Sequence, residues 1–180
     1  MEGGSTILEL ENQFLEKFSS DRNSSYPETK ITFRKLQSDD FSRGYYDVLS
    51  NLTTTGDVTQ SQFEEQFSRI DPQNSETYKI IVGVDEATDR IVTNGTLLIE
   101  QKFIRECAAC GHIEDIVVHK DYGKQGLGRD VLQVIKELAK INKCYKVILD
   151  CSDGYKGFYE KNDFEQKGVQ MAKYNPEEED

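Results

Sequence analysis

Three glycines within six residues, Gly123, Gly126 and Gly128, separate a segment with strand character from one with helix character. The segment before them, His112–His119, is apolar and short, as strands are. The segment after them repeats apolar side chains on one helix face, at Leu127, Val131, Val134, Ile135 and Leu138. A second strand-like segment, Lys146–Cys151, follows. A strand, a glycine turn, a helix and a strand make a βαβ crossover, which requires the two strands to run parallel.

The rest of the chain adds strands and helices around this crossover. A polar turn, Glu86–Asp89, joins the apolar segments Lys79–Asp85 and Ile91–Glu100, which predicts an antiparallel hairpin. The other predicted elements are a strand Ile31–Leu36, helices Asp39–Leu52, Thr59–Ile70 and Gly154–Lys161, and a last strand Phe164–Lys173. The sequence therefore predicts an α/β fold with a mixed, mostly antiparallel central sheet, a parallel βαβ crossover and flanking helices.

The length of 180 residues suits one compact domain, which we expect over residues 31–174. Residues 1–30 are predicted to form a flexible or helical extension, because the polar run Ser19–Ser25 has too little apolar surface to fold alone. Helical spacing within this extension predicts a short amphipathic helix that docks on the body, through Ile7, Leu8, Glu11, Phe14, Leu15 and Phe18. Residues 175–180 are predicted to be an acidic tail.

The charge pattern limits the classes of ligand. A formal net charge of -11 argues against nucleic acid, whose phosphates demand a broad basic face. Seven basic and three acidic residues nevertheless lie between His119 and Lys146, which fits either a small phosphorylated ligand or a solvated helix face. No apolar run approaches the roughly 20 residues that span a bilayer, and the N-terminus lacks a secretory pattern. We expect a soluble, cytoplasmic protein with no membrane partner.

Four cysteines raise the question of a metal site. Cys107 and Cys110 have the spacing of a zinc half-site, and His112 and His119 lie nearby. Cys144 and Cys151 are too widely spaced to form a second half-site, and Cys151 is predicted to be a small core residue. We therefore expect free thiols and no metal.

The glycine turn has a chemistry of its own. At the start of a helix the backbone N–H groups have no helical partner, and the helix dipole adds partial positive charge. Glycines let the backbone approach a phosphate, and Lys124 and Arg129 add whole charges, although a plain tight turn would use the same residues. The P-loop spacing is absent, and the turn lies too late in the chain for a dinucleotide-binding fold. The remaining ligand class is the pyrophosphate of coenzyme A.

Five motifs carry a resemblance to a known family. Gln125-Gly126-Leu127-Gly128 resembles the cofactor signature of the GNAT superfamily of N-acetyltransferases. Over about residues 31–171, the chain resembles the eukaryotic glucosamine 6-phosphate N-acetyltransferases, through Cys110–Val118, Cys144–Lys146, Leu149–Cys151 and Phe158–Lys161. The resemblance implies the acyl-CoA N-acyltransferase fold, acetyl-CoA as co-substrate, no metal and an intertwined homodimer. It also implies direct acetyl transfer to the amine of a small sugar phosphate, glucosamine 6-phosphate, on the way to UDP-N-acetylglucosamine.

The same resemblance implies roles for individual residues. Tyr159 would protonate the departing thiolate, while Glu114 and Asp150 would bind or deprotonate the amine, with Asp115 as another candidate base. The residues that would contact the cofactor are Ile116, Val117, Val118, Lys124, Gln125, Gly126, Leu127, Gly128, Arg129, Tyr159, Glu160 and Lys161. The residues that would contact the sugar phosphate are Thr53, Lys102, Phe103, Ile104, Arg105, Glu114, Asp115, Ile116, Tyr145, Lys146, Asp150 and Lys173.

The acidic pair also stands out without the resemblance. Glu114 and Asp115 interrupt an otherwise apolar strand, which is costly unless the two carboxylates face a cleft. Some positions depart from the superfamily pattern, because Gly123 stands where Gln or Arg is usual and Tyr174 where close relatives have a phosphate-binding arginine. Lys173 is the expected substitute for that arginine, with a weaker point-charge contact.

Two other functions stay open at this point. The chain could acetylate a protein or polyamine amine, which its acidic net charge would attract. It could also be a non-catalytic acyl-coenzyme A sensor, although Tyr159, Glu114 and Asp150 together argue for catalysis.

Overall fold

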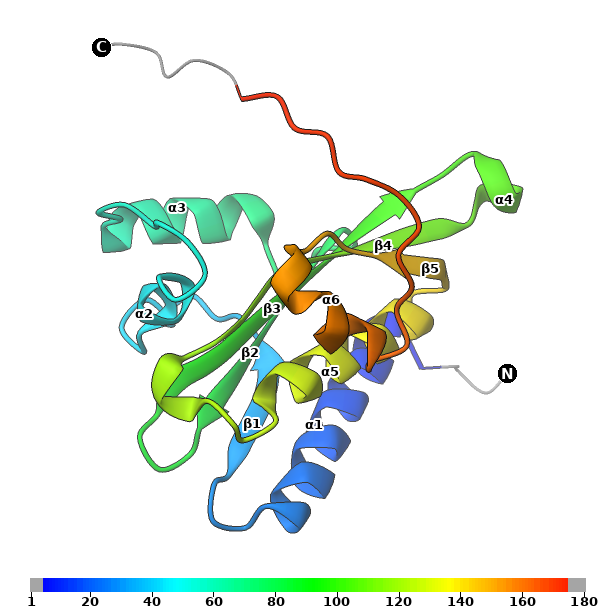
Figure 1. Cartoon of the computed structure of the whole chain (residues 1–180). Coiled ribbons are helices and arrows are strands. Elements are labelled where there is room, and N and C mark those ends of the chain that lie inside the picture. The colour runs from blue at the N-terminus through cyan, green and yellow to red at the C-terminus, as the bar shows by residue number, and fades with distance from the viewer. Residues whose placement is uncertain (1–4, 175–180) are drawn as a thin grey trace. The chain divides into compact units, whose positions relative to one another are not determined.

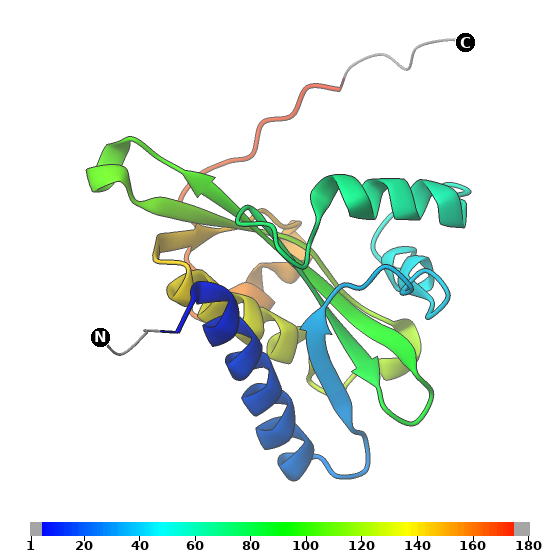
Figure 2. The same cartoon turned by 180° about the vertical axis from the view of Figure 1, so that it is seen from behind.

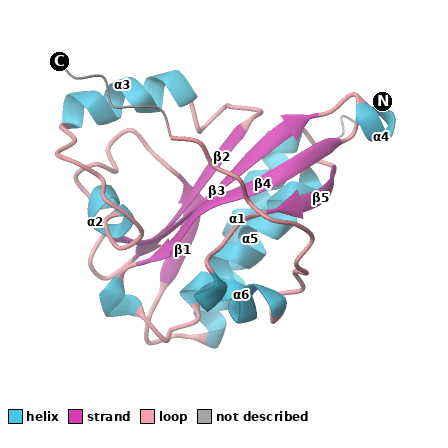
Figure 3. Ribbon diagram, turned by 45° about the horizontal axis from the view of Figure 1, so that its top comes forward, coloured by secondary structure: helices cyan, strands magenta, loops and turns pink. Residues whose placement is uncertain are grey.

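The computed structural model describes residues 5–174, which divide into two units. The larger unit extends to Ile148, and the smaller begins at Leu149. The larger unit contains a five-stranded sheet with the order β1-β2-β3-β4-β5 (Figure 3). Its strands are β1 (Ile31–Lys35), β2 (Tyr78–Asp85), β3 (Arg90–Gln101), β4 (Ala109–Val118) and β5 (Cys144–Ile148). The first four strands pair antiparallel and β4 pairs parallel with β5, which confirms the mixed sheet and the βαβ crossover.

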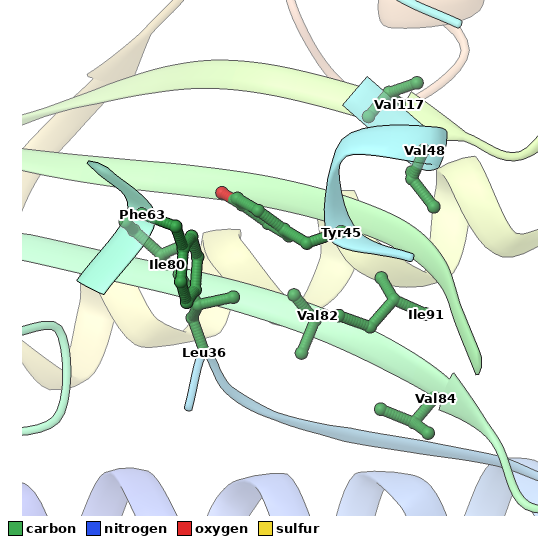
Figure 4. Packing of buried hydrophobic residues seen from close by; sticks show 9 residues of the cluster. All are labelled: Leu36, Tyr45, Val48, Phe63, Ile80, Val82, Val84, Ile91 and Val117. Carbon is green, nitrogen blue, oxygen red and sulfur yellow. The ribbon is translucent and has the colours of Figure 1, made fainter. Parts of the chain in front are cut away.

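Helices cover both faces of this sheet. Figures 1 and 2 show α1 (Ile7–Ser25) beside α5 (Leu127–Ile141) on one face. The other face carries α2 (Tyr45–Leu49) and α3 (Gln60–Ile70), whose side chains form a hydrophobic cluster with the sheet (Figure 4). This cluster contains Leu36, Tyr45, Val48, Phe63, Ile80, Val82, Val84, Ile91 and Val117. The predicted apolar face of α5 is buried as expected, because Leu127, Val131, Val134, Ile135 and Leu138 are each at most 1% exposed.

The predicted docking helix is present and is longer than the sequence suggests. α1 begins with a capping box between Thr6 and Glu9. Of the two forms expected for residues 1–30, flexible or helical, the structure has a helix that includes the polar run Ser19–Ser25. The helix continues there because polar side chains find partners on the body: the Ser19 hydroxyl accepts the Phe33 N–H at 2.9 Å.

The predicted helix Asp39–Leu52 is wrong in extent, because only α2 is helical and residues 38–44 form turns. The buried Asp40 carboxylate organises these turns by accepting the Gln37 N–H and the Arg34 guanidinium, at 2.7 to 2.8 Å. Gly44 then takes a left-handed φ of 81° directly before α2. Local side-chain hydrogen bonds of this kind compete with helix formation.

The C-terminal part contains the other errors of extent. The strand predicted as Lys146–Cys151 begins earlier and ends at Ile148. The last predicted strand is wrong, because residues 164–173 of the smaller unit form no regular element and are mostly exposed. A strand needs a hydrogen-bonded neighbour, and the described part of the smaller unit contains one helix, α6 (Asp153–Glu160), and no strand.

Two further expectations concern cysteines and membranes. Cys151 is exposed, so its prediction as a core residue is wrong, whereas Cys110 is buried. Among residues 5–174, no three or more His, Cys, Asp or Glu side chains cluster closely enough to hold a metal ion. In the same range, none of the helices has the length and apolar character needed to cross a bilayer.

Candidate active site

The glycine turn connects β4 to α5 through the short 3-10 helix η1 (Lys120–Tyr122). Gly126 caps α5 with a left-handed φ of 78°, which glycine adopts without steric cost. No side-chain hydrogen bond caps this end of α5, so its first N–H groups are available to an anion. Lys124 and Arg129 are exposed at the same end. The turn therefore has the geometry and charge of the predicted pyrophosphate site.

A cavity of about 480 Å³ opens between this turn and the segment that joins α1 to β1. Its lining residues are Arg22, Tyr26, Glu28, Thr29, Lys124, Gln125, Gly126 and Arg129. Arg22 is already engaged, because it donates to the Asp130 carboxylate at 2.9 Å and to the Thr29 carbonyl at 2.8 Å. This wall of the cavity has no signal in the sequence, because it depends on where α1 docks. A larger hollow of about 710 Å³ beside α2 contains none of the predicted site residues.

The second half of β4 has a free edge. β5 pairs with β4 only from Ala109 to His112, so residues 113–118 have no strand on that side within the described sheet. Backbone groups at such an edge can bind an extended ligand as an added strand. This geometry agrees with the role expected for Ile116 and Val118 toward the pantetheine arm.

A β-bulge interrupts β4 at the acidic pair. Asn94 pairs with Val117 and Thr96 with Glu114, so Asp115 and the next residue lie together opposite a single residue of β3. Asp115 has a left-handed φ of 54°. Asp115 is exposed, yet partial desolvation raises the pKa of its carboxyl.

The residues around the bulge on the α2 face are polar although they are buried. Asn94 and Thr96 of β3 are 0% and 6% exposed, and Tyr45 of α2 is 8% exposed. Burial, followed by the charge of Asp115, raises the pKa of Tyr45. Asn94 and Thr96 are not among the predicted site residues, although polar residues inside the apolar run Ile91–Glu100 are the same kind of signal as Glu114 and Asp115 in the next strand.

The predicted sugar-phosphate ligands Lys102, Phe103, Ile104 and Arg105 lie in and before α4 (Ile104–Cys107), at the end of the β3–β4 hairpin (Figure 1). The Arg105 guanidinium lies over the Tyr145 ring at 5.8 Å, and the Lys146 ammonium lies over the same ring at 5.5 Å. The structure thus brings Arg105, Tyr145 and Lys146 together. Lys102 is paired with Glu100 instead, at 2.5 Å.

Backbone strain is concentrated in this same loop. Arg105, Glu106 and Cys107 have φ values of 56°, 59° and 61°, which non-glycine residues rarely adopt. Thr53 lies in the loop that follows α2, where its N–H bonds to the Leu49 carbonyl. Residues 102–107, called the arm below, therefore contain three successive residues in a conformation that costs free energy.

The smaller unit contains the other predicted catalytic residues. Tyr159 is half-buried on α6, packed edge-on against the Phe158 and Phe164 rings, and burial raises its pKa. Asp150 is exposed and accepts a hydrogen bond from the Gln170 amide at 2.7 Å. Glu160 ends α6, Lys161 caps it, and Lys173 is exposed beyond it. A tyrosine hydroxyl is protonated at neutral pH, so Tyr159 has a proton to donate.

Comparison with known proteins identifies the family. A sequence model of the acetyltransferase (GNAT) domain matches residues 76–166. A glucosamine 6-phosphate N-acetyltransferase from Dictyostelium discoideum is 46% identical over 85% of this chain and 96% of its own. The crystal structure of the Arabidopsis thaliana glucosamine-6-phosphate N-acetyltransferase superposes with a TM-score of 0.76 at 39% identity, covering 80% of this chain and 97% of that one. This chain belongs to the GNAT acetyltransferase family.

Membership of the GNAT family implies acetyl-CoA as co-substrate. The residues present fit it, because an uncapped helix end with Lys124 and Arg129 suits the pyrophosphate and the free edge of β4 suits the pantetheine arm. The GNAT match also confirms the fold class and the general reaction type predicted from the sequence.

Proposed function

We propose that this protein transfers the acetyl group of acetyl-CoA to the amine of D-glucosamine 6-phosphate, giving N-acetyl-D-glucosamine 6-phosphate and CoA. The observation that carries the proposal is the 46% identity, over 85% of the chain, to a relative named for this reaction. The site geometry supports acetyl transfer independently, through the anion turn and the free β4 edge. The reaction would supply a step of UDP-N-acetylglucosamine synthesis in the cytoplasm, with which the free thiols of Cys110 and Cys144 are compatible.

The proposed reaction forms a C–N bond and breaks the C–S bond of the thioester. The sugar ammonium first loses a proton to a carboxylate, for which Asp150, Glu114 and Asp115 are the candidates. The neutral amine attacks the acyl carbon, and a β4 backbone N–H stabilises the developing oxyanion. As the C–S bond breaks, the departing thiolate takes a proton from the Tyr159 hydroxyl, and the second proton lost by the new amide nitrogen returns to the tyrosine through solvent.

The proposed substrate subsite uses the cations of the arm. Arg105 can bind a phosphate with two parallel hydrogen bonds, and Lys146 lies on the same aromatic ring. Thr53, Lys102, Phe103, Ile104, Tyr145 and Lys173 complete the set that the family resemblance assigns to the sugar phosphate. Lys173 would take the place of the arginine that Tyr174 replaces.

The proposal includes a homodimer. Phe103 and Ile104 at the tip of the arm are 98% and 63% exposed, which is unusual for adjacent large apolar residues of a monomer. A second copy of the chain would cover them and could complete the substrate site. Light scattering on the purified protein checks this point: a monomer at micromolar concentration would contradict the dimer.

The experiment that tests the function is thiol release from acetyl-CoA with a panel of amines. We expect fast release with glucosamine 6-phosphate and little with free glucosamine, because the phosphate contacts are lost. Release with a polyamine or a peptide amine, and none with the sugar phosphate, would select the other acetyltransferase function. Binding of CoA without turnover on any amine would select the sensor.

The same assay tests Tyr159. We expect Tyr159→Phe to lower kcat by about 100-fold, which is the usual contribution of a general acid, with little change in the KM for acetyl-CoA. Tyr155→Phe is the matched control, because Tyr155 lies on the same helix and is 66% exposed. Equal rates in the two variants would remove Tyr159 from the mechanism.

A further inference from the structure

Asn94 contacts the bulge of β4 in a way that neither the sequence nor the family match assigns. Its side-chain Nδ2 donates to the Asp115 carbonyl at 3.0 Å. The residue is 0% exposed, and its Oδ1 has no hydrogen-bond partner among the described residues. A buried amide oxygen without a hydrogen-bond partner lowers the free energy of unfolding. An asparagine at this position therefore reduces stability in one respect, while its amide nitrogen holds the bulge.

The residue that Asn94 holds is in a conformation that its side chain disfavours. The left-handed φ of 54° at Asp115 belongs to the type of bulge in which glycine is the usual residue. Aspartate tolerates this conformation better than most side chains, yet it still pays a steric cost. The bulge displaces the Asp115 carbonyl from the regular hydrogen-bond ladder of the sheet. The Asn94 amide donates a hydrogen bond to this carbonyl in its place.

The next residue of β3 makes room for the bulge. A Cβ on Gly95 would lie 2.5 Å from Ile135 Cδ1 and 2.7 Å from Ile116 Cδ1, so the Ile116 side chain occupies the space above this glycine. Asn94 and Gly95 therefore both stabilise the bulge. Asn94 does so with a hydrogen bond to the Asp115 carbonyl, and Gly95 leaves room for the Ile116 side chain.

The bulge lies where β4 is expected to meet the reactants. β5 leaves β4 after His112, and the bulge follows three residues later on the free edge. A change at Asp115 would redirect both its carboxylate and the backbone N–H groups that follow it. Displacing such groups by about 1 Å can cost a factor of 100 in rate.

We infer that Asn94 is a positioning residue for acetyl transfer: its amide fixes Asp115 in the bulge and thereby aims the Asp115 carboxylate and the following β4 amides at the reacting groups. This inference rests on the proposed function for its kinetic consequence. Its geometric part, the dependence of the bulge on Asn94, does not.

The test compares two buried side chains of the same strand. Asn94→Ala removes the bond to the Asp115 carbonyl, whereas Thr93→Val removes the 2.7 Å bond from Thr93 Oγ1 to the Val117 carbonyl, outside the bulge. We expect Asn94→Ala to lower kcat at least about 10-fold. The variant should still bind one CoA molecule per chain, with an affinity within about threefold of that of the parent. Thr93→Val should leave kcat within about twofold and lower only the melting temperature.

A double-mutant cycle separates positioning from general destabilisation. Glycine adopts a left-handed φ without help, so in an Asp115→Gly background the Asn94→Ala substitution should change kcat by less than about threefold. A crystal structure of Asn94→Ala gives a readout that needs no turnover, because φ at residue 115 should leave the left-handed region.

The outcomes separate the two levels of proposal. Absence of turnover of glucosamine 6-phosphate by the parent protein refutes the proposed function, and the crystal structure then decides the inference alone. An Asn94→Ala structure with an unchanged Asp115, or equal kcat losses in Asn94→Ala and Thr93→Val, overturns the inference whatever the substrate.

Discussion

At the scale of single residues, Asp115 combines a strained backbone with a partly desolvated carboxyl. Its φ is 54°, and burial raises its pKa above the ordinary value of 3.8. A group whose pKa is raised by folding stabilises the protein below its unfolded pKa, and this contribution is lost as the pH rises through the folded pKa. Ionisation of Asp115 therefore opposes folding at neutral pH.

Two substitutions separate the charge from the backbone. We expect Asp115→Asn to have a larger free energy of unfolding than the parent at pH 7, because asparagine also tolerates a left-handed φ and cannot ionise. This difference in stability should become smaller as the pH falls toward 4, where the parent's Asp115 becomes protonated. Asp115→Ala should be about 1 kcal/mol less stable than Asp115→Asn at every pH, because alanine pays the full cost of the conformation. Urea unfolding across this pH range measures both effects. A difference between the Ala and Asn variants that changes with pH would contradict this account.

Some features of the acidic pair Glu114 and Asp115 are visible in the sequence, and others are not. Glu114 and Asp115 can be recognised in the sequence because carboxylates interrupt an apolar strand. The bulge cannot be recognised in this way, because it depends on the register that sets Asp115 opposite Gly95 of β3. The roles of Asp150 and Tyr159 came from the family resemblance, since an aspartate after a strand and a tyrosine on a short helix are common in any fold.

At the scale of elements, α1 is joined to the sheet by a buried ionic cluster around Glu11. The Glu11 carboxylate is 0% exposed, forms ion pairs with Lys35 at 2.7 Å and Lys79 at 2.9 Å, and accepts a hydrogen bond from the Asn142 amide at 2.8 Å. Desolvation alone would raise the pKa of Glu11, but the bonds from Lys35, Asn142 and Lys79 outweigh it and lower this pKa. The cluster ties α1 to β1, β2 and the end of α5.

We expect Glu11→Gln to lower the free energy of unfolding by about 3 to 5 kcal/mol at pH 7, because it leaves two buried ammonium groups without a counter-charge. Because folding lowers the pKa of Glu11, its stabilisation is present above the unfolded pKa and is lost as the pH falls. The difference in free energy of unfolding between parent and variant should therefore become smaller in acid. Glu16→Gln, at an exposed position of the same helix, is the control and should change stability by less than about 0.5 kcal/mol. Equal effects of the two substitutions would show that the cluster contributes nothing.

The elements differ in how well the sequence predicts them. Helices with a clear apolar face, such as α5, and the β2–β3 hairpin carry their signals locally. The end of α1 was missed because Ser19 and Arg22 are stabilised by partners far along the chain, at Phe33 and Asp130. The strand predicted for residues 164–173 is wrong, because a sequence segment does not show whether a neighbouring strand exists to pair with it.

At the scale of the whole molecule, the net charge opposes the proposed substrates. The chain carries a formal charge of -11, while acetyl-CoA and a sugar phosphate are both anions. Long-range repulsion would slow their association at low salt. The exposed cations Lys124 and Arg129 at the start of α5 act in the opposite direction over a short range.

The ionic-strength dependence of the reaction decides between these two effects. The Debye length is about 8 Å at physiological salt, so a bound cofactor feels mainly the charges next to it. We therefore expect the KM for acetyl-CoA to rise several-fold between about 0.05 and 0.5 M sodium chloride, because the local attraction is screened. Lys124→Ala and Arg129→Ala should raise the KM at low salt and flatten its salt dependence, whereas Lys17→Ala, an exposed lysine on α1, should change neither. A KM that falls as salt is added would mean that the overall negative charge, and not the basic end of α5, controls the encounter.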